Sequence, residues 1–67
     1  MQKNFSFYDP ISQRWIQAFI VYNTHPYPMI RLKDPQDQYY KQEGLSPKRP
    51  FYMDIKHLEA QERIWWE

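Results

Sequence analysis

The chain of 67 residues contains no cysteine and a single glycine. Without thiols it cannot form disulfides, thiolate zinc sites or a redox-active cysteine pair. A single glycine also excludes the glycine-rich loops that hold phosphates in nucleotide-binding proteins. A domain of this length buries only about 60% of the surface that its unfolded chain exposes. Its stability must therefore come from unusually effective packing or from a partner.

The sequence also lacks long apolar runs and a strong charge of either sign. No stretch approaches the ~20 apolar residues of a membrane-spanning helix, and the first residues contain no apolar signal-peptide core. Nine basic residues stand against eight acidic ones, which leaves a net charge of +1. We therefore expect a cytoplasmic protein with no membrane partner, and neither a polyanion mimic nor a strongly basic nucleic-acid binder.

Aromatic residues are what the chain has in quantity. Four Phe, six Tyr and three Trp make up 19% of it. Each large aromatic side chain can bury on the order of 150–250 Å². The aromatic residues can therefore close the core of one small domain, which we expect to comprise residues 1–67.

The stretch FYDPISQRW, residues 7–15, is compatible with two structures. In the first, Asp9 and Pro10 begin a helix, but that helix would be apolar nearly all round and a short chain cannot cover it. In the second, Asp9 and Pro10 form a turn between two strands. The β-branched and aromatic residues after the turn favour the strand. We therefore predict strands at about 4–8 and 14–22, with Trp15 in the core.

A similar layout recurs 25 residues later, where KDPQDQYY follows an alternating stretch. Two strand–turn–strand units are the economical interpretation, with further strands at about 29–33 and 38–42. The alternative is a short helix within residues 34–44, with Asp34 as its N-cap and Gly44 just after its end. The sequence leaves both structures open.

The C-terminal part is predicted to contain a connector over residues 44–53 and a helix over residues 54–66. Asp54 is a suitable N-cap, and no proline or glycine interrupts the run. On a helix, Trp65 and Trp66 would point about 100° apart, so one small core would not hold both. The expected fold class is α+β: a small antiparallel β-meander, with a strongly curled SH3-like sheet as one option, followed by one C-terminal α-helix.

Two short stretches resemble known folds. YDPISQRW resembles the turn between strands of a kelch propeller blade. Because one such unit cannot make a propeller, this likeness implies only a hairpin. The succession RWIQAFIV, MIRLKD and QYYKQEG looks like a Tudor or other SH3-like barrel. That likeness implies a third function, in which tyrosines form an aromatic cage that reads a methylated ammonium through cation–π attraction.

No arrangement of residues predicts catalysis. His25 and His57 lie far apart, and neither belongs to a metal-binding spacing. Asp9, Asp34 and Asp54 are explained as turn or cap residues, and so small a core does not readily enclose a substrate pocket. We therefore expect no enzyme activity, no cofactor and no metal site.

The leading interpretation is a non-catalytic protein-binding module, such as an adaptor, an inhibitor or an accessory subunit. The connector SPKRPFY is stiff, basic and aromatic at its end, and tryptophan is a frequent interface anchor. Another protein is the expected partner, with a homo-oligomer as a further option. The predicted contact residues are Trp66, Lys48, Arg49, Phe51 and Tyr52.

The alternative is single-strand nucleic-acid binding on an aromatic and basic face of the sheet. Tyrosines would stack on bases while cations contact phosphates, although the near-neutral charge favours neither strong nor salt-sensitive binding. The residues predicted for this face are Arg14, Tyr22, Arg31, Lys33, Tyr39, Tyr40 and Lys41, with Trp15 beside them.

Overall fold

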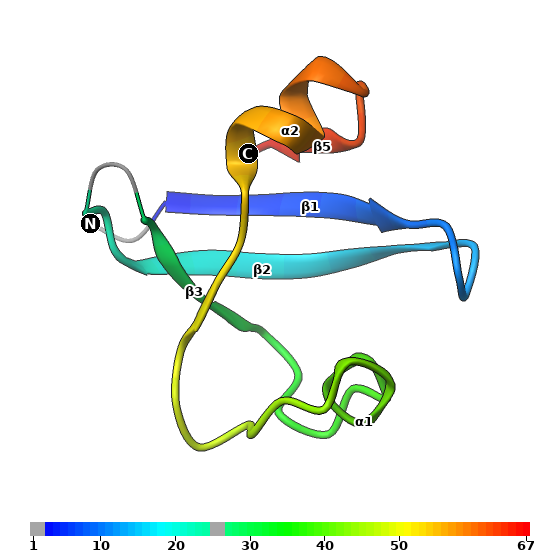
Figure 1. The fold of residues 1–67 in the computed structure, drawn as a ribbon, viewed down its shortest axis with the longest axis vertical. Helices are drawn as coiled ribbons and strands as arrows, with labels where there is room; N and C mark the ends of the chain where they lie inside the picture. Colours follow the sequence, from blue (N-terminus) through cyan, green and yellow to red (C-terminus); the bar gives the residue numbers. More distant parts are fainter. Residues whose placement is uncertain (1–2, 25–26) are drawn as a thin grey trace.

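A computed structural model describes residues 3–24 and 27–67 and shows a five-stranded antiparallel sheet with two short helices (Figure 1). The strand order is β4-β3-β2-β1-β5, so the sheet is open and the last strand lies beside the first. The elements are β1 Lys3–Asp9, β2 Arg14–Tyr22, β3 Met29–Leu32, α1 Tyr39–Glu43, β4 Phe51–Tyr52, α2 Ile55–Ala60 and β5 Ile64–Trp66.

Residues 7–15 form the hairpin that the sequence predicts. The strands β1 and β2 pair in antiparallel register over the whole length of β1. In the turn, the Asp9 carboxylate accepts hydrogen bonds from the backbone N–H groups of Ile11 and Ser12, and from the Ser12 hydroxyl at 2.6 Å. These two N–H groups lie in the turn, where no strand offers them an acceptor, and the Asp9 carboxylate is their hydrogen-bond acceptor.

One face of the sheet carries the core, and Trp15 is not part of it. Trp15 was predicted to be buried, but 51% of its surface is exposed. Side chains alternate along a strand, so Trp15 shares its face with Gln17, while Ile16 and Ala18 point inward. The buried hydrophobic residues are Phe5, Phe7, Ile16, Ala18, Ile20, Ile30, Leu32, Tyr40, Phe51, Met53 and Leu58.

The strand predicted at residues 38–42 is wrong, because Tyr39–Glu43 is the helix α1. The short helix that the sequence left as the alternative is therefore present. Asp34 is not its N-cap; the carboxylate of Asp37 accepts a hydrogen bond from the first helical N–H at 2.9 Å. Gly44 ends the helix with φ 69°, a left-handed conformation that glycine adopts without steric cost.

The helical turn lets two adjacent tyrosines reach the core side of the sheet. Tyr40 is buried, and its hydroxyl accepts a hydrogen bond from the Leu32 backbone N–H at 3.0 Å. Tyr39 is half-buried, with its ring centroid 5.2 Å from that of Phe7. A strand would have directed the two rings to opposite faces, which explains why the helix replaces the predicted strand.

The helix predicted over residues 54–66 is also corrected. Asp54 does cap α2, since its carboxylate accepts the His57 backbone N–H at 3.2 Å. However, the helix ends at Ala60, and Ile64–Trp66 forms the strand β5, which pairs with β1. An open five-stranded sheet with two short helices thus replaces the predicted meander with one C-terminal helix. Within the described residues, no helix is long and apolar enough to cross a membrane.

Strand β5 places the two adjacent tryptophans on opposite faces of the sheet. Trp66 pairs in register with the buried Phe5, and the two ring centroids lie 5.3 Å apart. Trp65 points the other way and is 71% exposed. Figure 1 shows β5 and α2 together at one side of β1, with α1 at the far side of β2.

The turn between α2 and β5 contains a strained residue. Glu62 has φ 55°, and the next N–H, from Arg63, donates to the Leu58 carbonyl at 2.9 Å. This arrangement is a helix-ending motif in which glycine is the usual residue. We expect Glu62→Gly to raise the free energy of unfolding by about 1 kcal/mol, because a side chain in the left-handed region costs that much.

Urea unfolding of the variant measures this effect. The matched control is Gly44→Ala, which creates the same strain at φ 69° in open space and should lower stability by about 1 kcal/mol. A Glu62→Gly variant that is less stable than the parent would show that the Glu62 side chain contributes more than its backbone strain costs.

Candidate functional site

Two exposed tryptophans flank a small residue on the outer face of the sheet, which points away from the core. Ser6 on β1 pairs with Gln17 on β2 and with Trp65 on β5. Trp15 pairs with Tyr8, two residues further along β1. Trp65 therefore stands directly opposite Ser6 on one neighbouring strand, and Trp15 stands diagonally opposite it on the other.

The surface between the tryptophans is hollowed. A hollow of about 270 Å³ is lined by Ser6, Trp15 and Trp65. A second hollow of about 370 Å³ shares Ser6 and Trp15 with the first and continues toward β3, so the two form one groove, which we call the tryptophan groove. The lining of the second hollow is Ser6, Trp15, Ile16, Gln17, Lys33, Asp34 and Asp37.

Trp15 and the beginning of β5 are held by neighbouring contacts. The Tyr8 ring lies against Trp15, with centroids 5.6 Å apart and planes tilted by 60°. The Arg63 guanidinium donates two hydrogen bonds to the Tyr8 carbonyl, from Nε at 3.2 Å and from Nη2 at 3.1 Å. In return, the Tyr8 N–H donates to the Arg63 carbonyl at 2.9 Å. The beginning of β5, which carries Trp65, is thus joined to β1, which pairs with the Trp15 strand β2.

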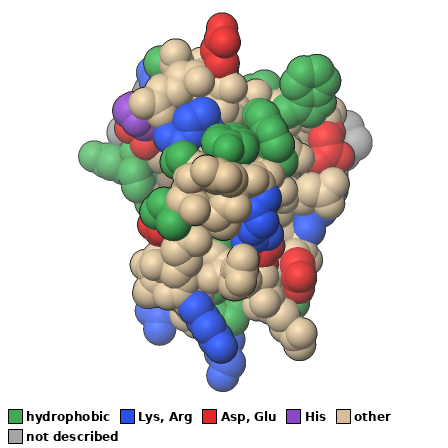
Figure 2. Space-filling model, turned by 90° about the vertical axis from the view of Figure 1, so that its right-hand side faces the viewer, with side chains coloured by type: hydrophobic (Ala, Val, Ile, Leu, Met, Phe, Trp, Pro, Cys, Tyr) green, Lys and Arg blue, Asp and Glu red, His purple; other side chains and the backbone are tan. Residues whose placement is uncertain are grey.

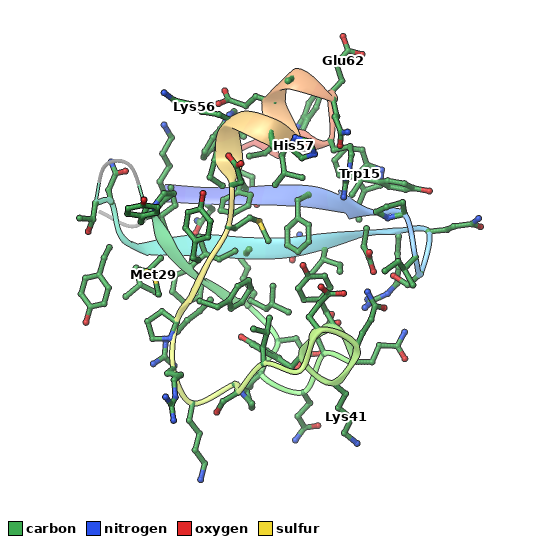
Figure 3. All side chains as sticks on the ribbon, viewed as in Figure 1. Trp15, Met29, Lys41, Lys56, His57 and Glu62 are labelled. Atoms are coloured by element: carbon green, nitrogen blue, oxygen red, sulfur yellow. The ribbon has the colours of Figure 1, made fainter. Side chains whose placement is uncertain are left out.

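The figures place this region in the molecule. Figure 2 shows the end that carries the β1–β2 turn, where hydrophobic side chains gather in the upper half, and basic side chains lie both among them and at the lower end. In Figure 3, Trp15 lies beside that turn, in the half that holds α2 and β5. Lys41 lies on α1 at the opposite end.

Two carboxylates near the groove are structural hydrogen-bond acceptors. Asp37 binds the Arg14 guanidinium through two hydrogen bonds, at 2.6 and 3.2 Å, and this contact lowers the pKa of Asp37. Burial alone would raise the pKa of Asp9, but hydrogen bonds from Ser12, Gln42 and the turn backbone outweigh it and lower the pKa. Both contacts tie α1 to the first hairpin.

The lowered pKa of Asp37 predicts a stability that depends on pH. A lowered folded-state value means that the contribution is complete above the ordinary pKa of about 3.9. It is lost as the pH falls through the lower folded-state value. Asp37→Asn should therefore cost about 1–2 kcal/mol at pH 7, and less near pH 3. Urea unfolding at both pH values measures this, with the exposed Glu59→Gln as the control. An equal loss at both values would contradict the expectation.

The residues predicted to contact a protein partner lie in separate places. Trp66 is half-buried on Phe5, with the Lys3 ammonium 4.4 Å from its ring centroid. Trp66 and Tyr52 line one hollow of about 420 Å³, beside α2. Phe51 belongs to the core and lines another hollow with Arg49. Lys48 and Arg49 are exposed in the loop before β4, away from the tryptophan groove.

The residues predicted for a nucleic-acid face do not share one surface either. Tyr40 is buried, and Tyr39 is packed against the core, where burial raises the pKa of Tyr39 to about 12. Arg14 is bound to Asp37. Tyr22 lies at the far end of β2 from Arg14. The remaining predicted residues are Arg31, which donates to the Lys48 carbonyl, Lys33, which meets Glu67, and the exposed Lys41 on α1.

The two histidines do not form a site with the residues that the structure describes. His57 is exposed on α2, and His25 lies outside the described residues. Across residues 3–24 and 27–67, no group of three or more His, Cys, Asp or Glu side chains is arranged to hold a metal ion.

Sequence reasoning missed Trp65 and Ser6 as site residues. The alternation in FSFY places Ser6 on the other face of the strand from Phe5 and Phe7, so the strand period already predicts that Ser6 points outward. For Trp65 no comparable signal exists, because the helical pattern of residues 54–66 conceals the strand β5.

Comparisons of the chain with models of protein families, with curated proteins and with solved structures find no match.

Proposed function

We propose that the protein is a small non-catalytic protein-binding module, an adaptor, inhibitor or accessory subunit, that holds its partner in the tryptophan groove. The observation that carries this proposal is the pair of indoles on the outer face, with Trp15 51% and Trp65 71% exposed on either side of one hollow. Tryptophan is enriched among the residues that supply most interface energy. Covering both rings would add apolar burial at about 25 cal/mol per Å².

The charges beside the groove favour a protein over a nucleic acid. Asp34 and Asp37 line its second hollow, and Glu67 lies within 3.6 Å of Lys33 at its edge. Carboxylates beside the stacking rings would repel a phosphate backbone, on which most nucleic-acid affinity depends.

The electrostatics near the groove also support a binding role over catalysis. The pKa values of Asp9 and Asp37 are lowered by hydrogen bonds. A general acid or base works best with a pKa near the operating pH. Two carboxylates held in the ionised form are suited to fixing α1 against the hairpin.

Affinity capture with matched variants tests the proposal. The tagged chain is exposed to a lysate of its own cells and compared with a double variant, Trp15→Ser with Trp65→Ser. The control double variant, Ile11→Ser with Tyr22→Ser, removes exposed hydrophobic surface elsewhere. We expect the parent and the control to retain one discrete protein in equimolar amount, and the groove variant to lose it.

Two results would contradict the proposal. Equal retention by all three chains would place the interface on another surface. If the parent retains no protein in stoichiometric amount, the chain is not a protein-binding module.

A further inference from the structure

The tryptophan groove has the length of a short peptide segment. One row of outward residues crosses β5, β1 and β2, from Trp65 through Ser6 to Gln17. It ends at Lys33, which directly follows β3 and donates its backbone N–H to the Gln17 carbonyl. Neighbouring strands lie about 4.8 Å apart, so three spacings make the row about 14 Å long. An extended chain covers that distance with about four residues.

The two ends of the groove differ in chemistry. The first hollow is walled by the indoles of Trp15 and Trp65, with the Ser6 hydroxyl as its small polar floor. An apolar side chain fits such a surface. Among the side-chain hydrogen bonds between described residues, none involves Ser6 or Gln17. Both are therefore available to bind a peptide backbone.

Carboxylates dominate the second hollow. Its charged lining residues are Lys33, Asp34 and Asp37. The Lys33 ammonium nitrogen lies 3.6 Å from a carboxylate oxygen of Glu67, and the Asp37 carboxylate is bound to the Arg14 guanidinium. In the described part of the chain, Asp34 has no ion-pair partner. With these ion-pair partners included, three carboxylates stand against two cations, and Trp15 lines the same hollow.

A cationic side chain of the ligand is the chemical complement of this end. An ammonium or guanidinium group is attracted to an indole face, and a carboxylate adds a charge-assisted hydrogen bond. Trp65 and Lys33, at the outer ends of the two hollows, lie about three strand spacings or 14 Å apart, so side chains bound inside the two hollows are separated by about three residues of extended chain.

We propose that the tryptophan groove recognises an extended peptide segment of the partner that carries an arginine or lysine in the second hollow. An apolar side chain, about three residues away, lies between Trp15 and Trp65. The inference rests on the proposed function and adds the chemical class of the bound segment.

Peptide selection tests the inference. A library of displayed random heptapeptides is selected on the immobilised chain and counter-selected on Ser6→Tyr, whose ring fills the floor of the groove. Tyrosine is well tolerated in strands, and Ser6 points away from the core. Val21→Tyr, at the other end of the outer face, is the matched control and should still bind the selected peptides.

We expect arginine or lysine to be enriched at least threefold over the input library, about three residues from an apolar residue. Groove-dependent peptides without a basic residue would overturn the inference and leave the proposed function standing. A selection without any groove-dependent peptide would also overturn it, while capture of the whole partner would still decide the proposed function.

A second measurement isolates the charge. Replacing the basic residue of a selected peptide by neutral citrulline should weaken binding at least tenfold. Asp34→Asn should weaken the parent peptide at least fivefold and the citrulline peptide little, because the two changes remove the same interaction. In NMR titrations, the indole N–H signals of Trp15 and Trp65 should shift more than that of Trp66.

Equal affinity for the citrulline peptide would overturn the inference. Sedimentation of the parent and of Ser6→Tyr gives a further test. Self-association of the parent that Ser6→Tyr abolishes would also overturn the inference, because a second copy would then occupy the groove.

Discussion

Replacing Phe5 with alanine should unfold most of the protein at room temperature. Phe5 is 0% exposed, at the centre of the core face of β1. Deleting a buried phenylalanine usually costs about 3–5 kcal/mol. For a small domain, that loss approaches the whole free energy of unfolding, which is about 5 kcal/mol at the low end of the usual range.

The position of Phe5 explains why the effect is global. Its ring lies 6.3 Å from Phe7 and 5.3 Å from Trp66, measured between centroids. Its strand is hydrogen-bonded to β2 on one side and to β5 on the other. A cavity at Phe5 would therefore weaken both neighbouring strands together.

Circular dichroism melts and urea unfolding measure the effect. The matched control is Phe19→Ala, on the outer face of β2 opposite Asn4, the residue before Phe5. Because Phe19 is only half-buried, its removal should cost less than about 2 kcal/mol. If the two variants melt at the same temperature, the core does not lie on the face described here.

Replacing Trp65 with alanine should weaken partner binding by about 30-fold or more and leave the melting temperature nearly unchanged. Interface tryptophans often contribute 2 kcal/mol or more, which corresponds to about 30-fold in the dissociation constant. Trp65 is 71% exposed on the outer face, so little of the core depends on it.

The neighbouring Trp66→Ala is the matched control and should behave in the opposite way. Trp66 packs on Phe5, so its loss should lower the free energy of unfolding by about 2 kcal/mol or more. The folded fraction should keep its affinity. A melt and a binding titration on each variant separate the two roles. A large drop in stability for Trp65→Ala, with unchanged affinity, would remove Trp65 from the site.

The sequence by itself determined the features that depend on neighbouring residues. The Asp9-Pro10 turn, the strands on either side of it, the Asp54 cap and the left-handed Gly44 are all present. Each depends on a local cause: a carboxylate that binds nearby N–H groups, the period of two along a strand, or the freedom of glycine at positive φ.

Tertiary structure alone decided that Ile64–Trp66 forms a strand, and the candidate site depends on that strand. Residues 54–66 carry helical signals throughout. However, the free edge of β1 offers hydrogen-bond partners to Ile64–Trp66. The Trp66 ring also packs on Phe5 and shields it from solvent. These distant contacts outweigh local propensity, which amounts to under 1 kcal/mol per residue. Because β1 pairs with β2 on one side and with β5 on the other, it brings together two segments that are far apart in the sequence. The alternation of side chains along β5 then turns Trp65 outward, on the same face as Trp15.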